Sequence, residues 1–324
     1  MEKVALKESV GSTALTKFRD PDVTVKGEPR AFVRFERLDT LWFNTGTLCN
    51  IECRNCYIES SPSNDRLAYL SAAEVGRFLD EVDDLALPTR EVGFTGGEPF
   101  MNPELLEMVE GALVRGLEVL ILTNAMQPMM RPHIQEGLVR LRGMHLDRLK
   151  LRVSLDHFTQ SLHDTERGQG SWERALEGTR WLAANSFKLT VAGRTCWGED
   201  EARARAGYQR LFSAEDLPVD AADPEALVLF PEMDPTAEVP EISVHCWETL
   251  GVDPRAIMCA SGRMVVKRKG ATNPAVVACT LLPYDRRFEL GDTLEESLGT
   301  VKLNHPYCAM FCVLGGGCCS AASG

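Results

Sequence analysis

The stretch 45–62, TGTLCNIECRNCYIESSP, places three cysteines at one short spacing directly after an apolar, strand-like segment. Cys49, Cys53 and Cys56 form the pattern CxxxCxxC, and the aromatic Tyr57 follows the last of them. Three thiolates on one tight loop can hold a metal cluster by three corners. The fourth corner then has no protein ligand, and such an open position distinguishes a catalytic metal site from a closed structural one.

Two other uses of the cysteines fit the sequence less well. A structural zinc site takes four ligands, commonly as two CxxC-like pairs, and the triplet has no fourth Cys or His nearby. Disulfides belong to oxidising compartments, whereas the start of the chain, MEKVALKESVGST, lacks the apolar core of a signal peptide. No stretch approaches a membrane span, so we expect a cytoplasmic protein whose thiols stay reduced. Iron–sulfur ligation therefore best explains the eleven cysteines.

The composition is that of an acidic globular protein. Its 324 residues are 44% hydrophobic and 25% charged, which allows one large domain with a smaller appendage. The formal net charge of -12 argues against a nucleic-acid partner, because binding a phosphate backbone needs neutralising Lys and Arg side chains. We expect no nucleic-acid partner and no membrane partner.

Apolar strand-like runs alternate with helical patterns from residue 38 to residue 235, which is typical of βα units around a parallel sheet. The expected strands are 38–44, 91–95, 118–123, 150–155, 188–192 and 226–230. The expected helices are 71–85, one opened by Asn102 and Pro103, 131–140, 171–185 and 200–212. This pattern predicts an α/β fold, an open, partial (β/α)6 barrel. We expect an N-terminal extension at 1–37, this core at 38–235, and a small Cys-rich α+β extension at 236–324.

Reactive groups in such a sheet gather at the carboxyl ends of the strands. The cysteine loop follows the first expected strand, and the second ends in Gly96-Gly97-Glu98-Pro99. Adjacent glycines let a backbone approach a ligand closely, Glu98 offers a hydrogen-bond acceptor, and Pro99 fixes the turn. The position of this turn, one βα unit after the triplet, makes the pair of motifs specific.

Together, the CxxxCxxC loop with Tyr57 and the turn 96–99 resemble the core of the radical S-adenosylmethionine (SAM) enzymes. The resemblance covers roughly residues 38–235. It implies that the three cysteines ligate a 4Fe-4S cluster whose open iron binds SAM. It also implies that Tyr57 lies beside the adenine and that the turn meets the amino group of the methionine moiety.

The resemblance suggests further residues of the SAM site. Thr123 and Asn124 end the third expected strand, where the family often has a polar pair near the cofactor. Ser154 and Asp156 end the fourth, like the segment that contacts the ribose hydroxyls, and Arg194 follows the fifth, where it could pair with the SAM carboxylate. The alternative for Ser154 and Asp156 is that they cap helices.

Beyond residue 235 the alternation fades and the cysteines crowd together. A β-hairpin is expected between Cys259 and Cys279. The pattern is similar to the SPASM or twitch extensions of radical SAM enzymes, which hold auxiliary clusters. It departs from a full SPASM domain, because Cys308-x-x-x-Cys312 replaces the expected CxxC pair. The resemblance therefore implies one auxiliary 4Fe-4S cluster, with ligands from Cys259, Cys279, Cys308, Cys312 and Cys318.

The remaining cysteines have other interpretations. Which tail cysteines bind iron stays open, since Cys318 and Cys319 are adjacent, and a free tail thiol acting on substrate is one alternative. Cys196 and Cys246 are expected to be small buried residues.

Four polar residues lie near the expected mouth of the site. His157 and His163 fit either proton relay or a capping or solvated role. Glu232 and Asp234 fit either substrate binding or a charged loop.

The resemblance implies that an electron from the reduced cluster cleaves SAM to a 5′-deoxyadenosyl radical, which abstracts hydrogen from a substrate. The expected function is oxidative modification of a peptide or protein side chain. The alternatives are action on a small-molecule metabolite, or a non-catalytic iron–sulfur carrier. The segment before residue 38 is too short for a separate leader-binding domain, which weighs against the peptide. The expected partners are SAM, the substrate, and an electron donor such as flavodoxin or ferredoxin.

Overall fold

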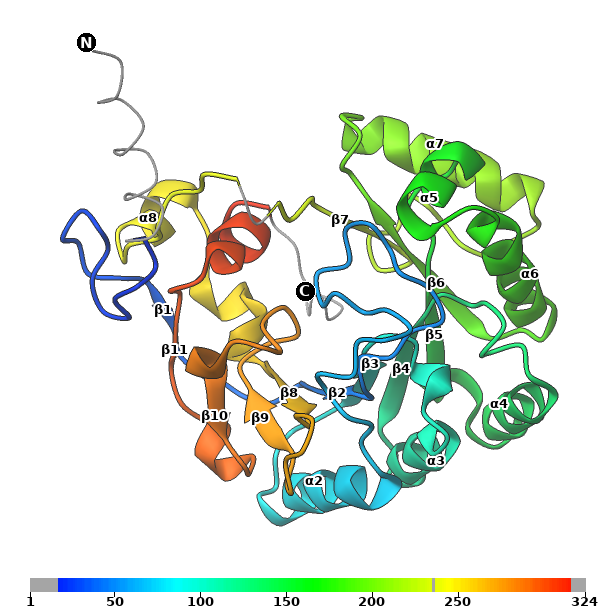
Figure 1. Cartoon of the computed structure of the whole chain (residues 1–324), viewed down its shortest axis with the longest axis horizontal. Helices are drawn as coiled ribbons and strands as arrows, with labels where there is room; N and C mark the ends of the chain where they lie inside the picture. The colour runs from blue at the N-terminus through cyan, green and yellow to red at the C-terminus, as the bar shows by residue number, and fades with distance from the viewer. Residues whose placement is uncertain (1–16, 235–236, 316–324) are drawn as a thin grey trace, which may run out of the picture. The chain divides into compact units, whose positions relative to one another are not determined.

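The computed structural model describes residues 17–234 and 237–315 (Figure 1). The chain forms two compact units. The first, which we call the sheet unit, comprises residues 37–232 and 262–298. The second, the small unit, is drawn from the chain up to residue 36, from 233–261 and from residue 299 onward.

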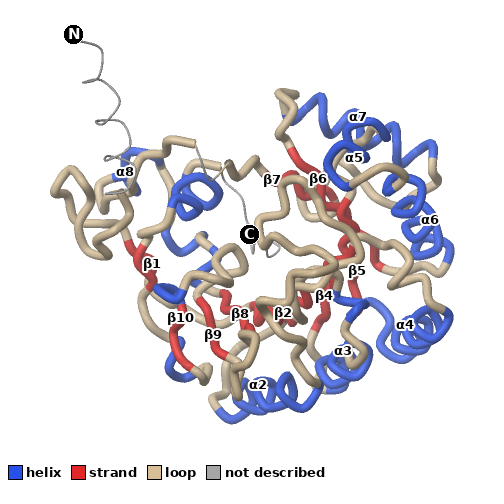
Figure 2. The backbone as a smooth tube through the Cα atoms, viewed as in Figure 1, coloured by secondary structure: helices blue, strands red, loops and turns tan. Residues whose placement is uncertain are grey.

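The sheet unit is built on a nine-stranded sheet with the order β10-β9-β8-β2-β3-β4-β5-β6-β7 (Figure 2). From β2 to β7 the strands are all parallel and lie in the order of the sequence. In the described residues β7 pairs with β6 and not with β2, so the strands form a barrel that is left open. The strand bounds are Thr40–Asn44 (β2), Glu91–Thr95 (β3), Glu118–Thr123 (β4), Leu149–Ser154 (β5), Lys188–Arg194 (β6) and Leu227–Phe230 (β7).

Three further strands extend this sheet beyond β2. Strand β8 (Gly262–Val266) runs parallel to β2, and β9 (Ala275–Val277) and β10 (Glu289–Gly291) follow antiparallel. The hairpin expected between Cys259 and Cys279 is therefore formed by β8 and β9. The compact units differ from the linear division expected from the sequence, because this hairpin adds to the sheet of the core.

Helices lie along the outer side of the strands of the sheet unit (Figure 1). Their bounds are Ala72–Asp84 (α2), Leu105–Val114 (α3), Pro132–His145 (α4), Gln160–Arg167 (α5), Ser171–Ala184 (α6) and Glu201–Ala214 (α7). The expected capping box is present: the Ser71 hydroxyl accepts from the Glu74 amide at 3.2 Å, and the Glu74 carboxylate accepts from the Ser71 amide at 2.9 Å.

Two helices differ from the sequence prediction. Helix α3 begins at Leu105, because the Asn102 amide group donates to the carbonyls of Thr45 and Leu70 and the chain turns there first. Helix α5 was not expected at all. Its buried residues are His163, Asp164 and Glu166, so the apolar stripe by which a surface helix is recognised is missing.

An aromatic cluster joins the first elements of the sheet unit. The ring of Phe43 in β2 stacks on Phe94 in β3, with centroids 5.7 Å apart, and meets Phe78 of α2 edge-on at 6.4 Å. All three side chains are fully buried. This packing sets β2 and β3 side by side, and the loops that follow these two strands therefore begin as neighbours.

The small unit contains a two-stranded antiparallel sheet and a buried ion pair. Strand β1 (Phe32–Val33) runs antiparallel to β11 (Val301–Lys302). Arg30 donates to the Glu241 carboxylate at 2.5 Å, and both side chains are almost wholly buried. This unit also contains α8 (Cys246–Leu250) and a π-helical turn, Cys308–Val313.

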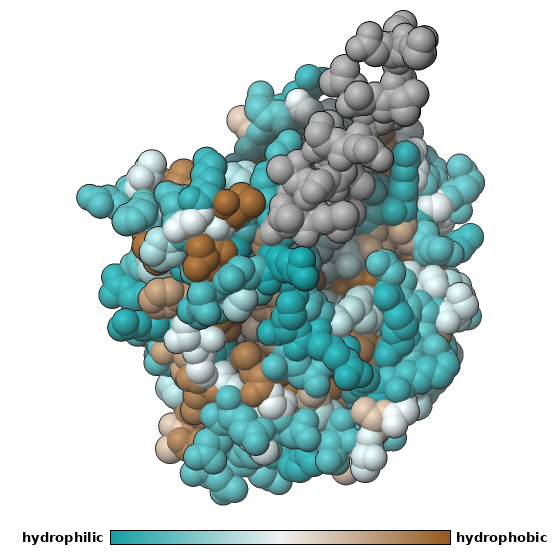
Figure 3. Space-filling model, turned by 60° about the vertical axis from the view of Figure 1, so that its left-hand side comes forward, coloured by the Kyte–Doolittle hydropathy of each residue, from teal (hydrophilic) through white to brown (hydrophobic). Residues whose placement is uncertain are grey.

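Among the described residues, no helix has the length and apolar character needed to cross a bilayer. On the face drawn in Figure 3, hydrophilic residues predominate and apolar residues are interspersed among them.

Candidate functional site

The cysteine loop leaves the carboxyl end of β2 and brings its thiols into a largely dry environment. Cys49 is buried, and Cys53 and Cys56 are half-buried. Burial raises the pKa of the Cys49 thiol to about 12, with a further contribution from the Glu98 carboxylate. Burial likewise raises the pKa of Cys53 to about 11. Without a metal the thiols of Cys49 and Cys53 stay protonated at neutral pH, and a coordinated metal would deprotonate them.

The Gly96-Gly97 turn lies against the cysteine loop, backbone to backbone. Gly97 N donates to Gly46 O at 2.9 Å and Glu98 N donates to Leu48 O at 3.1 Å. A Cβ on Gly96 would lie 2.4 Å from Gly46 O, and one on Gly97 would lie 2.1 Å from Leu48 O. The glycines were predicted to let a backbone approach a ligand. In this structure the close approach that requires them is to the loop that carries the cysteines.

Glu98 points into the protein and ties two strand ends together. Its carboxylate accepts from the Thr123 hydroxyl at 2.9 Å and from the Asn124 amide at 2.8 Å. Burial raises the pKa of this carboxyl group to about 7. The Asn124 side-chain amide donates to the Asn50 side-chain oxygen at 2.9 Å and lies 3.9 Å from Cys49 Sγ. The structure therefore brings Glu98, Thr123 and Asn124 to the cysteine loop.

Asp156 follows β5 and forms a buried ion pair. Its two carboxylate oxygens accept from Arg167 Nε and Nη2 at 2.8 and 2.9 Å. Burial alone would lower the pKa of Arg167, but Asp156 and the nearby Cys53 hold it above its ordinary value. Ser154 ends β5 and is half-buried. Asp156 caps no helix, so the capping alternative does not apply to it.

Arg194 is the last residue of β6, and its side chain bonds to the cysteine loop. Its Nη1 donates to Asn55 O and to Glu166 Oε1, both at 3.1 Å. Glu166, in the last turn of α5, also accepts from the Asn55 amide at 2.8 Å. The partner of Arg194 in this structure is therefore a carboxylate of the chain itself.

The structure also shows the burial and contacts of three more residues that the sequence analysis placed near the site. Tyr57 is half-buried directly after Cys56, and Pro99 is buried as the first residue of a short 3-10 helix. His157 is buried and hydrogen-bonded at both ring nitrogens, to Thr159 at 2.8 Å and to Glu199 at 2.9 Å. It is therefore neither solvated nor free to relay protons without breaking one of these bonds.

The auxiliary-cluster cysteines are distributed over both units. Cys259, Cys308 and Cys312 belong to the small unit, and Cys279 belongs to the sheet unit. Cys318 and Cys319 lie outside the described residues. Cys259 and Cys308 are buried, while Cys312 and Cys279 are half-buried.

The structure also shows the exposure of two further cysteines and of one acidic residue predicted near the site. Cys196 and Cys246 were interpreted as small buried residues, but both are half-buried. Glu232 is exposed at the end of the sheet-unit segment that follows β7.

The donor set at the triplet fits an iron–sulfur cluster. In the described part of the chain, no three His, Cys, Asp or Glu side chains converge on the position of a single metal ion. The fit therefore rests on the chemistry of the surroundings. Ser60 N lies 3.4 Å from Cys56 Sγ and the Asn124 amide lies near Cys49, so N–H groups are directed at sulfur. Hydrogen bonds to the sulfurs and exclusion of water are the means by which proteins hold and tune such clusters.

A CxxxCxxC loop with largely buried thiols, joined to a glycine turn at the carboxyl end of a parallel βα sheet, is the arrangement expected of a metal-cluster enzyme of the partial-barrel class. Residues 43–199 match the family model of the radical SAM superfamily, so this part of the chain is a radical SAM domain. Members of the superfamily use a 4Fe-4S cluster together with SAM.

Several curated proteins are similar to this chain. The AdoMet-dependent heme synthase of Methanosarcina barkeri is 31% identical over 144 residues, 44% of this chain and 38% of the relative. AlbA of Bacillus subtilis, an antilisterial bacteriocin subtilosin biosynthesis protein, is 30% identical over 145 residues, 44% of this chain and 30% of the relative. The mycofactocin maturase MftC of Mycobacterium tuberculosis is 29% identical over 163 residues, 49% and 39%. The matches thus span 30–39% of the length of these relatives.

Two solved structures share the fold. Streptococcus suis SuiB bound to its precursor peptide SuiA aligns with a TM-score of 0.57 at 11% identity, over 82% of this chain and 65% of SuiB. The enzyme anSMEcpe with bound AdoMet aligns with a TM-score of 0.57 at 14% identity, over 80% and 79%. At these identities the likeness concerns the fold alone.

The sequence reasoning missed the residues of α5 that meet the cysteine loop. Glu166 and Arg167 both lie in its last turn. Glu166 bonds to Asn55 inside the loop, whereas Arg167 pairs with Asp156 near Cys53. The one available signal was the run His163-Asp164 to Arg167, where four charged or ionisable residues crowd into a segment between two elements of a buried sheet. Such a run usually marks a solvated face.

Proposed function

We propose that the chain is a radical SAM enzyme that oxidatively modifies a side chain of a peptide or protein. The observation that supports the chemistry best is the backbone pairing of the CxxxCxxC loop with the Gly96-Gly97 turn, which joins the two family motifs in one place. The peptide substrate is supported by the relatives: one is a bacteriocin biosynthesis protein, one is a maturase, and the SuiB structure holds a precursor peptide.

The cofactor supplies the difficult step, since the superfamily's cluster and SAM together generate a 5′-deoxyadenosyl radical that abstracts hydrogen. The chain supplies position and dryness. Cys49, Cys53 and Cys56 would ligate the cluster. Because the Glu98 carboxylate is engaged by three donors of the chain, we assign the contact with the methionine amino group to the backbone of the turn 96–99.

The remainder of the SAM site is assigned by proximity to that turn. Tyr57 would lie beside the adenine, with Thr123 and Asn124 next to it. Ser154 and Asp156 would face the ribose. Arg194 would have to exchange its bond to Glu166 for the SAM carboxylate, and we therefore place it beside SAM rather than in contact with it.

The C-terminal cysteines complete the proposal. One auxiliary 4Fe-4S cluster would draw its ligands from Cys259, Cys279, Cys308, Cys312 and Cys318. It would anchor the substrate or accept its electron. We further propose that flavodoxin or ferredoxin reduces the enzyme in the cytoplasm, where thiols are kept reduced.

A small-molecule substrate is the second candidate. The heme synthase relative, 31% identical over 144 residues, supports it, because its name gives a small-molecule product. A gene for a short Cys-, Gly- or Ser-rich peptide beside this one would favour the peptide, and genes of a metabolite pathway would favour the alternative.

The test is 5′-deoxyadenosine release from SAM by the anaerobically reconstituted chain under dithionite, next to a Cys53→Ala, Cys56→Ala double variant. Release by the wild type alone supports radical initiation at the triplet. Adding the candidate peptide and following its mass then tests the substrate. Release by the double variant would refute the assignment. A fully iron-loaded wild type that neither cleaves SAM nor changes its electron paramagnetic resonance spectrum with SAM would instead indicate the carrier.

A further inference from the structure

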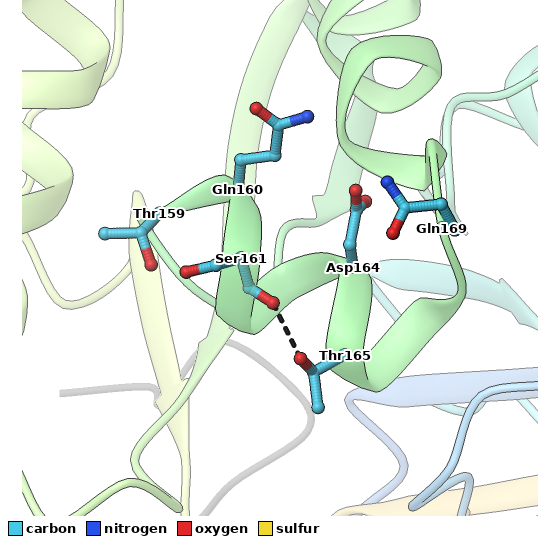
Figure 4. Close-up of a pocket in the computed structure, with 6 residues that line it drawn as sticks. All are labelled: Thr159, Gln160, Ser161, Asp164, Thr165 and Gln169. Carbon is cyan, nitrogen blue, oxygen red and sulfur yellow. Dashed lines mark hydrogen bonds between the residues drawn. The ribbon is translucent and has the colours of Figure 1, made fainter.

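Helix α5 has the opposite pattern to an ordinary surface helix. Its inward side carries His163, Glu166 and Arg167, all with little exposure, while its outer side is lined by uncharged hydroxyl and amide groups. These outer residues border a polar pocket of about 610 Å³ together with Asp164 (Figure 4). Buried charge is costly unless it is paired. A helix that departs from the apolar pattern in this way marks a place where function has overridden packing.

Glu166 directs its backbone carbonyl and both carboxylate oxygens at the link between Cys53 and Cys56. Its backbone carbonyl accepts from the Arg54 amide at 2.8 Å. One carboxylate oxygen accepts from the Asn55 amide at 2.8 Å and the other from the Asn55 side-chain amide at 3.0 Å. The Glu166 side chain is 4% exposed. The buried Glu166 thus bonds, through its carbonyl and its carboxylate, to two residues that are themselves exposed.

Arg194 completes the arrangement from β6. Its Nη1 bridges the same carboxylate and the Asn55 carbonyl, each at 3.1 Å. Asn55 is consequently bonded through its backbone N–H, its backbone carbonyl and its side chain. Within the described residues, Arg54 and Asn55 make these bonds to Glu166 and Arg194 and to no other side chain.

We propose that Glu166, supported by Arg194, is a positioning residue for the cysteine loop. It holds residues 54–55 in place, so that Cys53 and Cys56 keep the geometry needed to ligate the cluster. This inference rests on the proposed function, because it needs a cluster at the triplet. Groups that orient ligands without touching the metal typically contribute about 10–100-fold to metal affinity. Within the described residues no hydrogen bond joins Glu166 to either thiol, and the Glu166 charge is the smallest of the contributions that raise the pKa of Cys53, so its effect would act chiefly through the bonds to the loop.

The experiment compares iron release from the reconstituted full chain to a ferrous chelator under dithionite. Glu166→Gln keeps the size of the side chain but turns one acceptor oxygen into a donor, which would face N–H groups of Asn55 or Arg194. We expect iron release from the triplet to become about 10-fold faster. Glu177→Gln, an exposed acid on α6, is the matched control and should release iron as the wild type does.

A second variant approaches the same contact from the loop. Asn55→Asp replaces the donated side-chain amide with a carboxylate facing Glu166 and should speed iron release similarly. Because Asn55 is exposed, this variant keeps the fold, which thermal unfolding of the metal-free protein would check. The Cys53→Ala, Cys56→Ala chain measures the iron held elsewhere, and only iron above that baseline counts.

The outcomes separate the two proposals. Iron release from Glu166→Gln and Asn55→Asp at the rate of the Glu177→Gln control would overturn the positioning role, even if SAM is cleaved. Faster release, with an altered electron paramagnetic resonance signal of the reduced cluster and unchanged unfolding of the metal-free protein, supports it, even if SAM cleavage awaits a substrate. A wild type with no iron above the double-variant baseline would overturn both proposals.

Discussion

Replacing Gly97 with alanine tests whether the glycine turn and the cysteine loop are in contact as the structure has them. The new Cβ would lie 2.1 Å from Leu48 O and 2.6 Å from Leu48 C, whereas an ordinary contact is 3.4–4 Å. Both obstructing atoms belong to the backbone, so no side chain can rotate away. The two segments must separate by more than an ångström, and the bonds Gly97 N to Gly46 O and Glu98 N to Leu48 O would be lost.

The expected cost follows from those two bonds. Each lost hydrogen bond costs about 0.5–1.5 kcal/mol, and buried groups left unpaired cost about 1–3 kcal/mol, so we expect Gly97→Ala to lower the free energy of unfolding by about 2–4 kcal/mol. For a compact unit of this size that corresponds to a decrease in Tm of about 5–15 °C. Gly76→Ala is the control: a Cβ there meets nothing within 4 Å, and alanine should stabilise helix α2 by about 0.5–1 kcal/mol.

The assay is thermal unfolding of the metal-free, reduced protein followed by circular dichroism, so that cluster content does not contribute to Tm. Opposite shifts of the two alanine variants are expected. If Gly97→Ala melted together with the wild type while Gly76→Ala melted higher, the close approach of the turn to the loop would be refuted.

Three further substitutions probe the buried polar groups. Burial lowers the pKa of His163 to about 4, so the wild type should lose up to about 3 kcal/mol as pH falls from the unfolded value near 6.5 towards 4; His163→Leu should flatten this decline in urea unfolding, and an unchanged pH slope would contradict it. Asp156→Asn leaves the buried Arg167 without its counter-ion and should cost about 3–5 kcal/mol in urea unfolding, whereas Asp253→Asn in an exposed pair should leave the midpoint unchanged; equal shifts would mean that the first pair is solvated. Glu98→Gln places an amide N–H₂ against donors and should cost about 1–3 kcal/mol in urea unfolding, and a midpoint equal to that of the wild type would disprove the inward carboxylate.

Much of the sheet could be predicted because each strand is a short apolar run between turn signals. The six expected parallel strands all occur, with ends within two residues of those observed. Helix α2 was recognised by its capping box, a purely local signal. Helix α5 was missed, because its buried side is charged and local periodicity reports apolar stripes only.

For the candidate site, too, local motifs could be predicted and long-range contacts could not. The cysteines, the glycine turn and the strand-end polar residues could be predicted as site residues because each lies in a short motif at the end of a strand. Their partners were not. Glu98 was expected to serve a ligand, yet its carboxylate joins Thr123 and Asn124, and Arg194 was expected to pair with a cofactor carboxylate, yet it pairs with Glu166.

The sequence by itself determined which residues lie at the open end of the sheet, since the order of βα units places every strand-end loop on one side. It also determined the superfamily, through the spacing of three cysteines and one glycine turn. Only the tertiary structure decided which buried charged side chains pair with one another. Asp156 and Arg167 are eleven residues apart, and Asn55 and Glu166 are separated by 111. No local pattern encodes such pairs, because which buried charges meet depends on how the helices pack against the finished sheet.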